Sequence, residues 1–322
     1  MHPAFSVIFL TTLIGVGQGL FLALFTVESY AAFDLLPPQA SRFYALGSAL
    51  ALGFLVAGLI ASFFHLGHPE RAWRSAAKWR TSWLSREVIV LPAFMGTVFL
   101  YGAAHFTGFN LTLATLPSGV PVNVTAILGV AGTVLAFALF VCTGMIYACL
   151  RFLQEWHTPL TVINYTLLGG ASGFVLATAL AAPEVTRFSA GWAMILTLLA
   201  LIGRVASLLR NARLKPKSTL RTAIGVKHPR IAQKAQGAMG GSFNTREFFH
   251  GRSAAFLRQV KWIFLLLTFP LPLGLLAGGA ATGAAALLLA AFAVQYLGLL
   301  AERWFFFAQA NHPQNLYYQV IS

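Results

Sequence analysis

The sequence predicts an all-α, polytopic membrane protein, a single domain over residues 1–322 with eight transmembrane helices. Its composition leads to this fold class. Hydrophobic residues make up 58% of the 322 residues and charged residues only 9%, with 22 lysines and arginines against eight aspartates and glutamates. An ordinary soluble domain has about 25% charged residues, so this chain could not cover its apolar surface in water. Intrinsic disorder is excluded as well, because disordered chains are poor in apolar residues.

The order of apolar runs gives the expected helices. A membrane helix needs about 20 largely apolar residues, and eight runs reach that length. Prolines at 37–38, 117, 159 and 183 fall in the intervening loops, where helices usually stop. We interpret the first run as a true span and not as a cleavable signal, because no positive charge precedes it. The expected spans are residues 5–33, 42–65, 88–108, 123–150, 160–181, 189–210, 259–279 and 281–307.

Basic residues concentrate on one side of this topology. With eight spans, both termini share a side with the loops that follow spans two, four and six. Those loops hold 18 lysines and arginines, whereas the opposite loops hold two, Arg42 and Arg187. Cytoplasmic loops carry the excess of lysine and arginine in membrane proteins. We therefore expect a protein of the bacterial inner membrane with both termini in the cytoplasm.

The longest loop, residues 211–257, is basic and contains a single acidic residue, Glu247. One interpretation is that the positive charge of this loop orients the chain in the membrane and attracts the loop to anionic lipid. The other is a docking surface for a cytoplasmic partner, which the length of the loop and its glycine-rich part at 237–241 favour. Nucleic-acid binding is not expected, because the charge lies where topology already requires it. The candidate docking residues here and in loop 66–87 are Arg74, Lys78, Arg80, Lys227 and Arg230.

The cysteines and histidines give little support for a metal centre. Cys142 and Cys149 are too few for a four-cysteine cluster site, and we expect them to pack as small apolar residues. Haem bound by two histidines needs imidazoles that face each other inside the spans. His65 and His157 lie at span ends, and His105 lies at the opposite face. We expect neither an intrinsic haem nor an intrinsic iron–sulfur cluster.

A histidine and a glutamate bracket the loop at 66–87. His65 ends the second span, and its side chain titrates near neutral pH. Glu87 begins the third span, where Ser85 could cap the helix. The pair could exchange protons at one membrane face, or the two could be an interfacial histidine and a helix-start acid. Trp73 in this loop could belong to an aromatic belt or form a wall for a flat ring.

Other polar groups near the same face have simpler interpretations. Tyr147, Arg151 and Glu155 follow each other at intervals of four residues, which predicts a structural pair between the arginine and the glutamate on one helix. Arg204 lies inside span six, where a long side chain can reach the interface. Near the end of span eight, Glu302 and Arg303 could neutralise local charges. Glu28, near the outer end of the first span, has no assigned role.

Loop 66–87 also carries a family resemblance. Its segments FHLGHPERAWR, residues 64–74, and TSWLSRE, residues 81–87, resemble the signature loop of the DmsC family. These are the membrane anchor subunits of dimethyl sulfoxide reductase-type enzymes, related to the NrfD and polysulfide reductase anchors. The tail ERWFFFAQANHPQNLYYQ, residues 302–319, is also similar to the family. The eight spans fit this resemblance along the whole chain.

The resemblance implies a role in electron transfer. Anchors of this family hold a molybdopterin catalytic subunit and an iron–sulfur subunit with [4Fe-4S] clusters, and exchange electrons between a cluster and a quinone, here ubiquinone or menaquinone. The family's quinone-site histidine matches His65, and its carboxylate matches Glu87. Arg71 and Arg86 could then stabilise negative charge on the quinone, although they could equally serve only as positive-inside charge. Tyr147 joins the candidate quinone and proton residues.

The basic character of loop 66–87 bears on the branch of the family. If partners dock on this loop, they are cytoplasmic, which resembles the sulfite-oxidising branch. The segment KHPRIAQKAQGAMGGSFNTREFF, residues 227–249, is also similar to that branch. Electrons from sulfite would then pass through the partner clusters to quinone. The alternatives are a quinol-oxidising anchor of a dimethyl sulfoxide reductase-type enzyme, a secondary transporter, and a purely structural tether.

Overall fold

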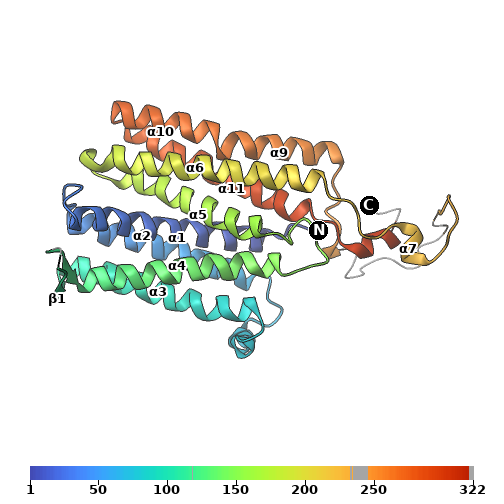
Figure 1. Ribbon diagram of the computed structural model, residues 1–322, viewed down its shortest axis with the longest axis horizontal. Coiled ribbons are helices and arrows are strands. Elements are labelled where there is room, and N and C mark those ends of the chain that lie inside the picture. The colour runs from blue at the N-terminus through green and yellow to red at the C-terminus, as the bar shows by residue number, and fades with distance from the viewer. Residues whose placement is uncertain (118, 233, 235–245, 319–322) are drawn as a thin grey trace.

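A computed structural model describes residues 1–117, 119–232, 234 and 246–318 of the chain. Within them, eight helical segments are long and apolar enough to cross a membrane, which confirms the predicted fold class. Figure 1 shows them lying side by side along the long axis of one bundle. The spans are α1 (Phe5–Ala32), α2 (Ser41–Phe63), α3 (Trp83–Thr107), α4 (Val124–Ala148), α5 (Pro159–Leu180), α6 (Pro183–Ala212), α9 (Ala254–Thr268) with α10 (Pro270–Thr282), and α11 (Ala285–Ala308).

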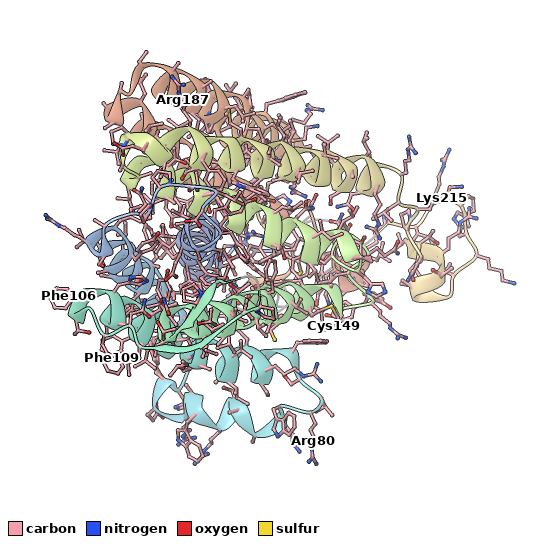
Figure 2. All side chains as sticks on the ribbon, turned by 60° about the vertical axis from the view of Figure 1, so that its left-hand side comes forward. Arg80, Phe106, Phe109, Cys149, Arg187 and Lys215 are labelled. Atoms are coloured by element: carbon pink, nitrogen blue, oxygen red, sulfur yellow. The ribbon has the colours of Figure 1, made fainter. Side chains whose placement is uncertain are left out.

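The shorter elements lie at the two ends of the bundle. Figure 1 places both termini and α7 at one end, which we name the basic end, and β1 at the other, the far end. Figure 2 likewise separates Lys215 and Arg80 from Arg187 and Phe106. The loops therefore alternate between the ends as the spacing of the spans predicts. The short elements are η1 (Pro69–Lys78), β1 (Thr112–Thr115), β2 (Pro121–Asn123), α7 (Leu220–Ile224) and η2 (Pro313–Tyr317), with β1 and β2 paired antiparallel.

Helices α1 and α5 form the centre of the bundle. In each, 72% of the membrane-spanning stretch is buried, against 28 to 33% in the other spans. Glycines bring the two backbones together, because a Cβ atom on Gly173 would lie only 2.0 Å from the carbonyl carbon of Gly19. Small residues let membrane helices approach closely where the lipid gives no hydrophobic drive for association. The remaining spans pack around this pair.

The third span begins earlier than expected. The sequence predicted a start near residue 88 with Ser85 as the cap, but α3 starts at Trp83. Ser82 is the cap, and its side-chain oxygen accepts a hydrogen bond from the Ser85 N–H at 3.3 Å. The cap is thus three residues earlier than the Ser85 that the sequence suggested, and serine suits this position. Glu87 therefore lies in the second turn of the helix, inside the bundle.

The seventh span is interrupted, although the sequence predicted a continuous run at 259–279. The helix breaks between α9 and α10 at Phe269, which has φ −119° and ψ −78°. Pro272 has no N–H to donate to the carbonyl four residues earlier, that of Thr268. The Gln295 Nε2 of α11 donates to this carbonyl instead, at 3.2 Å. A buried side chain thus satisfies the backbone group freed by the break, as a membrane interior requires.

The glycine contact between α1 and α5 leads to a stability prediction. Gly173→Ala should force the two helices apart and lower the free energy of unfolding by about 1–3 kcal/mol, the usual cost of overpacking. Gly191→Ala on α6 is the control, because a Cβ atom there meets nothing within 4 Å. Thermal unfolding in detergent should show a lower Tm for Gly173→Ala alone. Equal Tm values for the two variants would contradict the close contact.

Candidate functional site

Glu87 lies inside the bundle near the basic end. Its side chain is buried, and its carboxylate accepts a hydrogen bond from the Thr143 hydroxyl of α4. It lines a small cavity, which we name the Glu87 cavity. Polar side chains from α1, α5 and α11 complete the lining, namely Thr11, Thr12, Gln18, Tyr165, Ser172 and Arg303.

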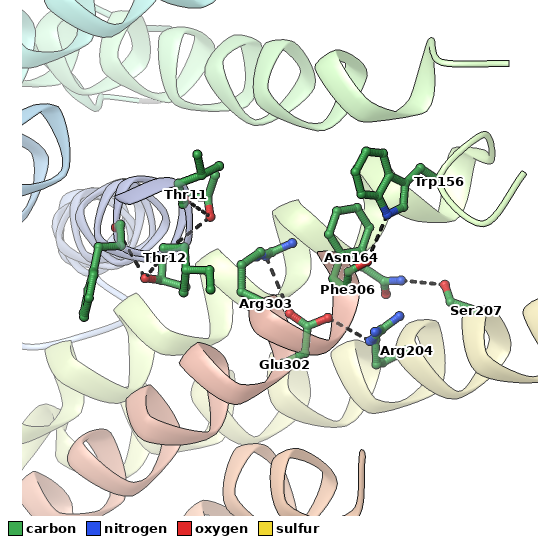
Figure 3. A network of polar contacts seen from close by, with 12 residues as sticks. Thr11, Thr12, Trp156, Asn164, Arg204, Ser207, Glu302, Arg303 and Phe306 are labelled. Carbon is green, nitrogen blue, oxygen red and sulfur yellow. Dashed lines mark hydrogen bonds and ion pairs between the residues drawn. The ribbon is translucent and has the colours of Figure 1, made fainter. Parts of the chain in front are cut away.

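A buried ion cluster lies next to this cavity. Glu302 of α11 lies between two arginines, as Figure 3 shows. Its Oε1 is 2.8 Å from Nε of Arg204 on α6, and its Oε2 is 3.8 Å from Nη2 of Arg303. All three side chains are at most 5% exposed. The Arg303 guanidinium also lies over the Tyr165 ring, 3.7 Å from its centroid, a favourable arrangement for a cation.

A second cavity lies on the other side of the ion cluster and reaches the basic end. Tyr165 and Arg303 line both cavities. The Asn164 Nδ2 donates to Ser207 Oγ at 2.7 Å within its lining, so we name it the Asn164 cavity. Toward the surface it is lined by half-buried residues, Glu155, Asn211 and Gln309.

The ion cluster corrects the expectation for Arg204. We expected its side chain to extend to the interface, but only 2% of it is exposed, and it pairs with Glu302. A buried charge is costly unless it is paired, and α11 supplies the partner from a distant part of the sequence. Glu302 and Arg303 do neutralise local charge, as expected, although deep in the packing. The available signal was three charges inside apolar helices, which mark functional candidates by default.

The structure does not bring His65 and Glu87 together in one cavity. His65 follows the end of α2 and is largely exposed. Burial of the remaining part lowers the pKa of its imidazole, which favours the neutral form. Within the described part of the chain, His65 lines neither cavity. The histidine lies at the edge of the basic end, whereas the glutamate faces the interior.

The basic and aromatic residues of loop 66–87 are mostly on the surface. Trp73 is 71% exposed, with Arg74 over its ring at 5.5 Å, so it forms no wall of either cavity. Arg71 pairs with the adjacent Glu70 at 3.5 Å. Arg86 donates to the backbone carbonyls of Trp79 and Arg80 at 2.9 and 2.8 Å, and this holds the loop against the start of α3.

Tyr147 belongs to an aromatic cluster near the basic end. Its ring stacks on Tyr165 at 5.6 Å and meets Trp156 and Phe306 edge to face. The expected pairing of Arg151 with Glu155 is wrong, because α4 ends at Ala148 and the intervals of four residues no longer place the two side chains on one helix face. Glu155 instead accepts a hydrogen bond from Asn311 Nδ2, at 3.5 Å.

The candidate docking residues lie at the basic end. Arg74, Lys78, Arg80, Lys227 and Arg230 are all exposed, and Figure 2 shows Arg80 and Lys215 projecting from this part of the molecule. The glycine-rich part of the long loop, residues 237–241, lies outside the described residues. Over the described chain, no group of three or more histidine, cysteine, aspartate or glutamate side chains could hold a metal ion.

Glu28 has partners at the far end that the sequence did not indicate. Its Oε2 accepts a hydrogen bond from the Tyr101 hydroxyl at 2.6 Å, and its Oε1 is 3.4 Å from the His105 Nε2. The Tyr44 ring stacks on the imidazole at 4.5 Å. A second cluster of titratable groups is therefore buried between α1, α2 and α3.

Comparison with known proteins identifies the family. A family model described as "DMSO reductase anchor subunit (DmsC)" matches residues 1–231. The chain belongs to the DmsC family. It is also 60% identical to one of the sulfite dehydrogenase subunits of Allochromatium vinosum over 326 aligned residues, covering 100% of both chains. The chain is thus a membrane anchor subunit of a DMSO reductase-like complex, which confirms the resemblance and favours an anchor over a transporter.

The ion cluster predicts an asymmetry between two substitutions. Glu302→Gln leaves both Arg204 and Arg303 without a counter-charge and should cost about 3–5 kcal/mol of stability, the range for breaking a buried ion pair. Arg204→Met should cost less, because Arg303 still faces Glu302 at 3.8 Å. Unfolding of the purified variants in detergent measures both, with Glu184→Gln as the control. A smaller loss for Glu302→Gln than for Arg204→Met would contradict this description of the cluster.

Proposed function

We propose that this subunit anchors cytoplasmic molybdenum and iron–sulfur subunits and passes electrons from sulfite oxidation to ubiquinone or menaquinone at the basic end. The observation that carries the proposal is Glu87, a carboxylate buried near that end beside a cavity that polar side chains help to line. Bound quinone accepts two electrons and two protons, so its site needs a proton-donating group within reach. The full-length similarity to a sulfite dehydrogenase subunit supports the choice of sulfite.

The roles of the two candidate residues follow from their positions. Glu87 is held by Thr143 and shielded from lipid, so it can store a proton and release it toward the quinone. His65 is exposed at the edge of the bundle, where a membrane-soluble ring would arrive, and its neutral imidazole can hydrogen-bond a carbonyl oxygen. The adjacent Phe64 is also exposed and offers apolar contact. These residue types fit a quinone.

The partner subunits would dock at the basic end. Its exposed cations come from two loops, with Arg74, Lys78 and Arg80 in one and Lys227 and Arg230 in the other. Complementary charge between two proteins speeds their encounter and sets their relative orientation more than it raises their affinity. Docking here would place a partner cluster close to the side on which Glu87 and His65 lie. The molybdopterin and [4Fe-4S] clusters belong to those partners.

A second candidate function has support from the family description. In a dimethyl sulfoxide reductase-type complex, the anchor would oxidise quinol and send electrons to the catalytic subunit. Glu87 and His65 would then accept protons instead of donating them. The difference lies in the partner's substrate, so assaying the purified complex with sulfite and with dimethyl sulfoxide distinguishes the two. Turnover with dimethyl sulfoxide alone would favour the reverse direction.

Substitution of the two candidate residues tests the quinone site. His65→Ala and Glu87→Gln should each lower quinone-linked sulfite oxidation by about 100-fold or more, the usual range for losing a proton-transfer group. Activity with a soluble dye acceptor should persist, because it bypasses the membrane subunit. His2→Ala and Glu184→Gln, both at exposed residues, serve as controls of the same residue types. Quinone-linked turnover at the normal rate in both variants would refute the assignment.

The orientation can be tested by labelling. In a Cys142→Ala, Cys149→Ala background, Lys217→Cys at the basic end should be protected from a membrane-impermeant maleimide in intact cells. Gln39→Cys, at the far end between α1 and α2, should react. Lysis should expose both sites equally. The reverse pattern would place the basic end outside the cytoplasm and the docking partners with it.

A further inference from the structure

The two cavities at the basic end lie in succession. Tyr165 of α5 and Arg303 of α11 line both. The Asn164 cavity continues from these two side chains to Glu155, which lies in the loop between α4 and α5. The Glu87 cavity continues from them in the other direction, to Glu87 and Thr143. Polar side chains thus line a series of spaces from the basic end to the buried carboxylate.

Several buried polar atoms along this series have no hydrogen-bond partner in the protein. Over the described residues, they include Nη2 of Arg204, Nε of Arg303 and Nε2 of Gln309, and all three side chains line the Asn164 cavity. An unsatisfied buried donor or acceptor costs about 1–3 kcal/mol. A cavity that meets such groups and has room for a water molecule can hold one, and that water makes two to four hydrogen bonds. The lining therefore points to a hydrated space.

The charges along the series suit the passage of a proton. Arg204 and Arg303 together carry one more charge than Glu302, so the three ionised groups have a net charge of +1. An ionised Glu87 next to Arg303 would bring the total to zero. Glu302 lies between the two guanidinium groups (Figure 3) and reduces their repulsion of an arriving proton. Each proton transfer to Glu87 therefore alternates the local charge between zero and +1.

We propose that the two cavities form one hydrated route that carries protons between the aqueous phase at the basic end and Glu87. Glu155 collects protons at the entrance, and water held by the Arg204–Glu302–Arg303 cluster passes them inward. The use of this route rests on the proposed function. Reduction of quinone takes two protons and two electrons, and the electrons come from a partner cluster, which is oxidised. This route supplies the protons that Glu87 delivers.

A cavity-filling variant tests the route without changing any charge. Ser207→Leu places an apolar side chain in the Asn164 cavity. Ser189→Leu is the matched control, because Ser189 is also a buried serine of α6 and, among the described residues, lines neither cavity. The readout is hydrogen–deuterium exchange of the Glu87 carboxyl group in the full-length chain without quinone. Its infrared carbonyl band is identified by its loss in Glu87→Gln.

The expected result is slower exchange in Ser207→Leu, by about tenfold or more, a typical size for blocking a proton-transfer step. Ser189→Leu should exchange like the unaltered chain. Equal exchange in Ser207→Leu and Ser189→Leu would overturn the route, because protons would then reach Glu87 by another path. If Ser207→Leu does not fold, Glu155→Gln with Glu184→Gln as its control gives the same comparison at the entrance.

Quinone-linked turnover separates this inference from the proposed function. In the assembled complex, Ser207→Leu should lower turnover and raise the solvent isotope effect, while binding of a fluorescent quinone-site inhibitor stays within about twofold of normal. If Ser207→Leu slows exchange but Glu87→Gln leaves quinone-linked turnover unchanged, the route stands and the role of Glu87 toward quinone is refuted. Loss of inhibitor binding in Ser207→Leu would show instead a disturbed binding site and overturn the route.

Discussion

The close contact of α1 with α5 determines where the functional side chains lie. Both helices are largely buried, and glycine at 19, 169 and 173 lets their backbones meet. Helix α1 also packs on α2, α4 and α11, and α5 on α4, α6 and α11. The threonines of α1, Thr11 and Thr12, and Tyr165 of α5 therefore line the same cavity. Bulkier residues at the crossing would separate the two sides of this cavity.

The pairing of polar groups inside the bundle follows from the absence of water in the hydrocarbon core of the membrane. Every charge placed there needs a partner, and the partners come from different spans, such as Glu302 of α11 for Arg204 of α6. The break in span seven obeys the same requirement through Gln295. Arg303 pairs with Glu302 in the ion cluster and also lines the Glu87 cavity. One side chain thus belongs both to the structural ion pairs and to the surroundings of the candidate proton group.

The sequence predicted the spans and their common side for the basic loops, because bilayer thickness and charge bias act on local composition. It named Glu87 as a candidate, but it could not predict that Thr143 bonds to Glu87 or that Tyr165 and Arg303 line the same cavity, since these depend on packing between distant spans. The break at Phe269 had a visible signal in Pro270 and Pro272. The sequence also could not show that His65 lies outside the Glu87 cavity, because this depends on the direction in which the second turn of α3 faces.

The far-end cluster around Glu28 has a consequence for energy conversion. Eighteen residues of α3 separate Glu87 from His105, roughly 27 Å along a helix. Within the described chain, Glu28 and His105 line neither polar cavity. If electrons and protons both enter at the basic end, no net charge crosses the bilayer during turnover. A membrane voltage of 100 mV changes the free energy of a reaction by about 2.3 kcal/mol for each charge that crosses. Because no charge would cross here, the reaction would run at the same rate in energised and de-energised membranes.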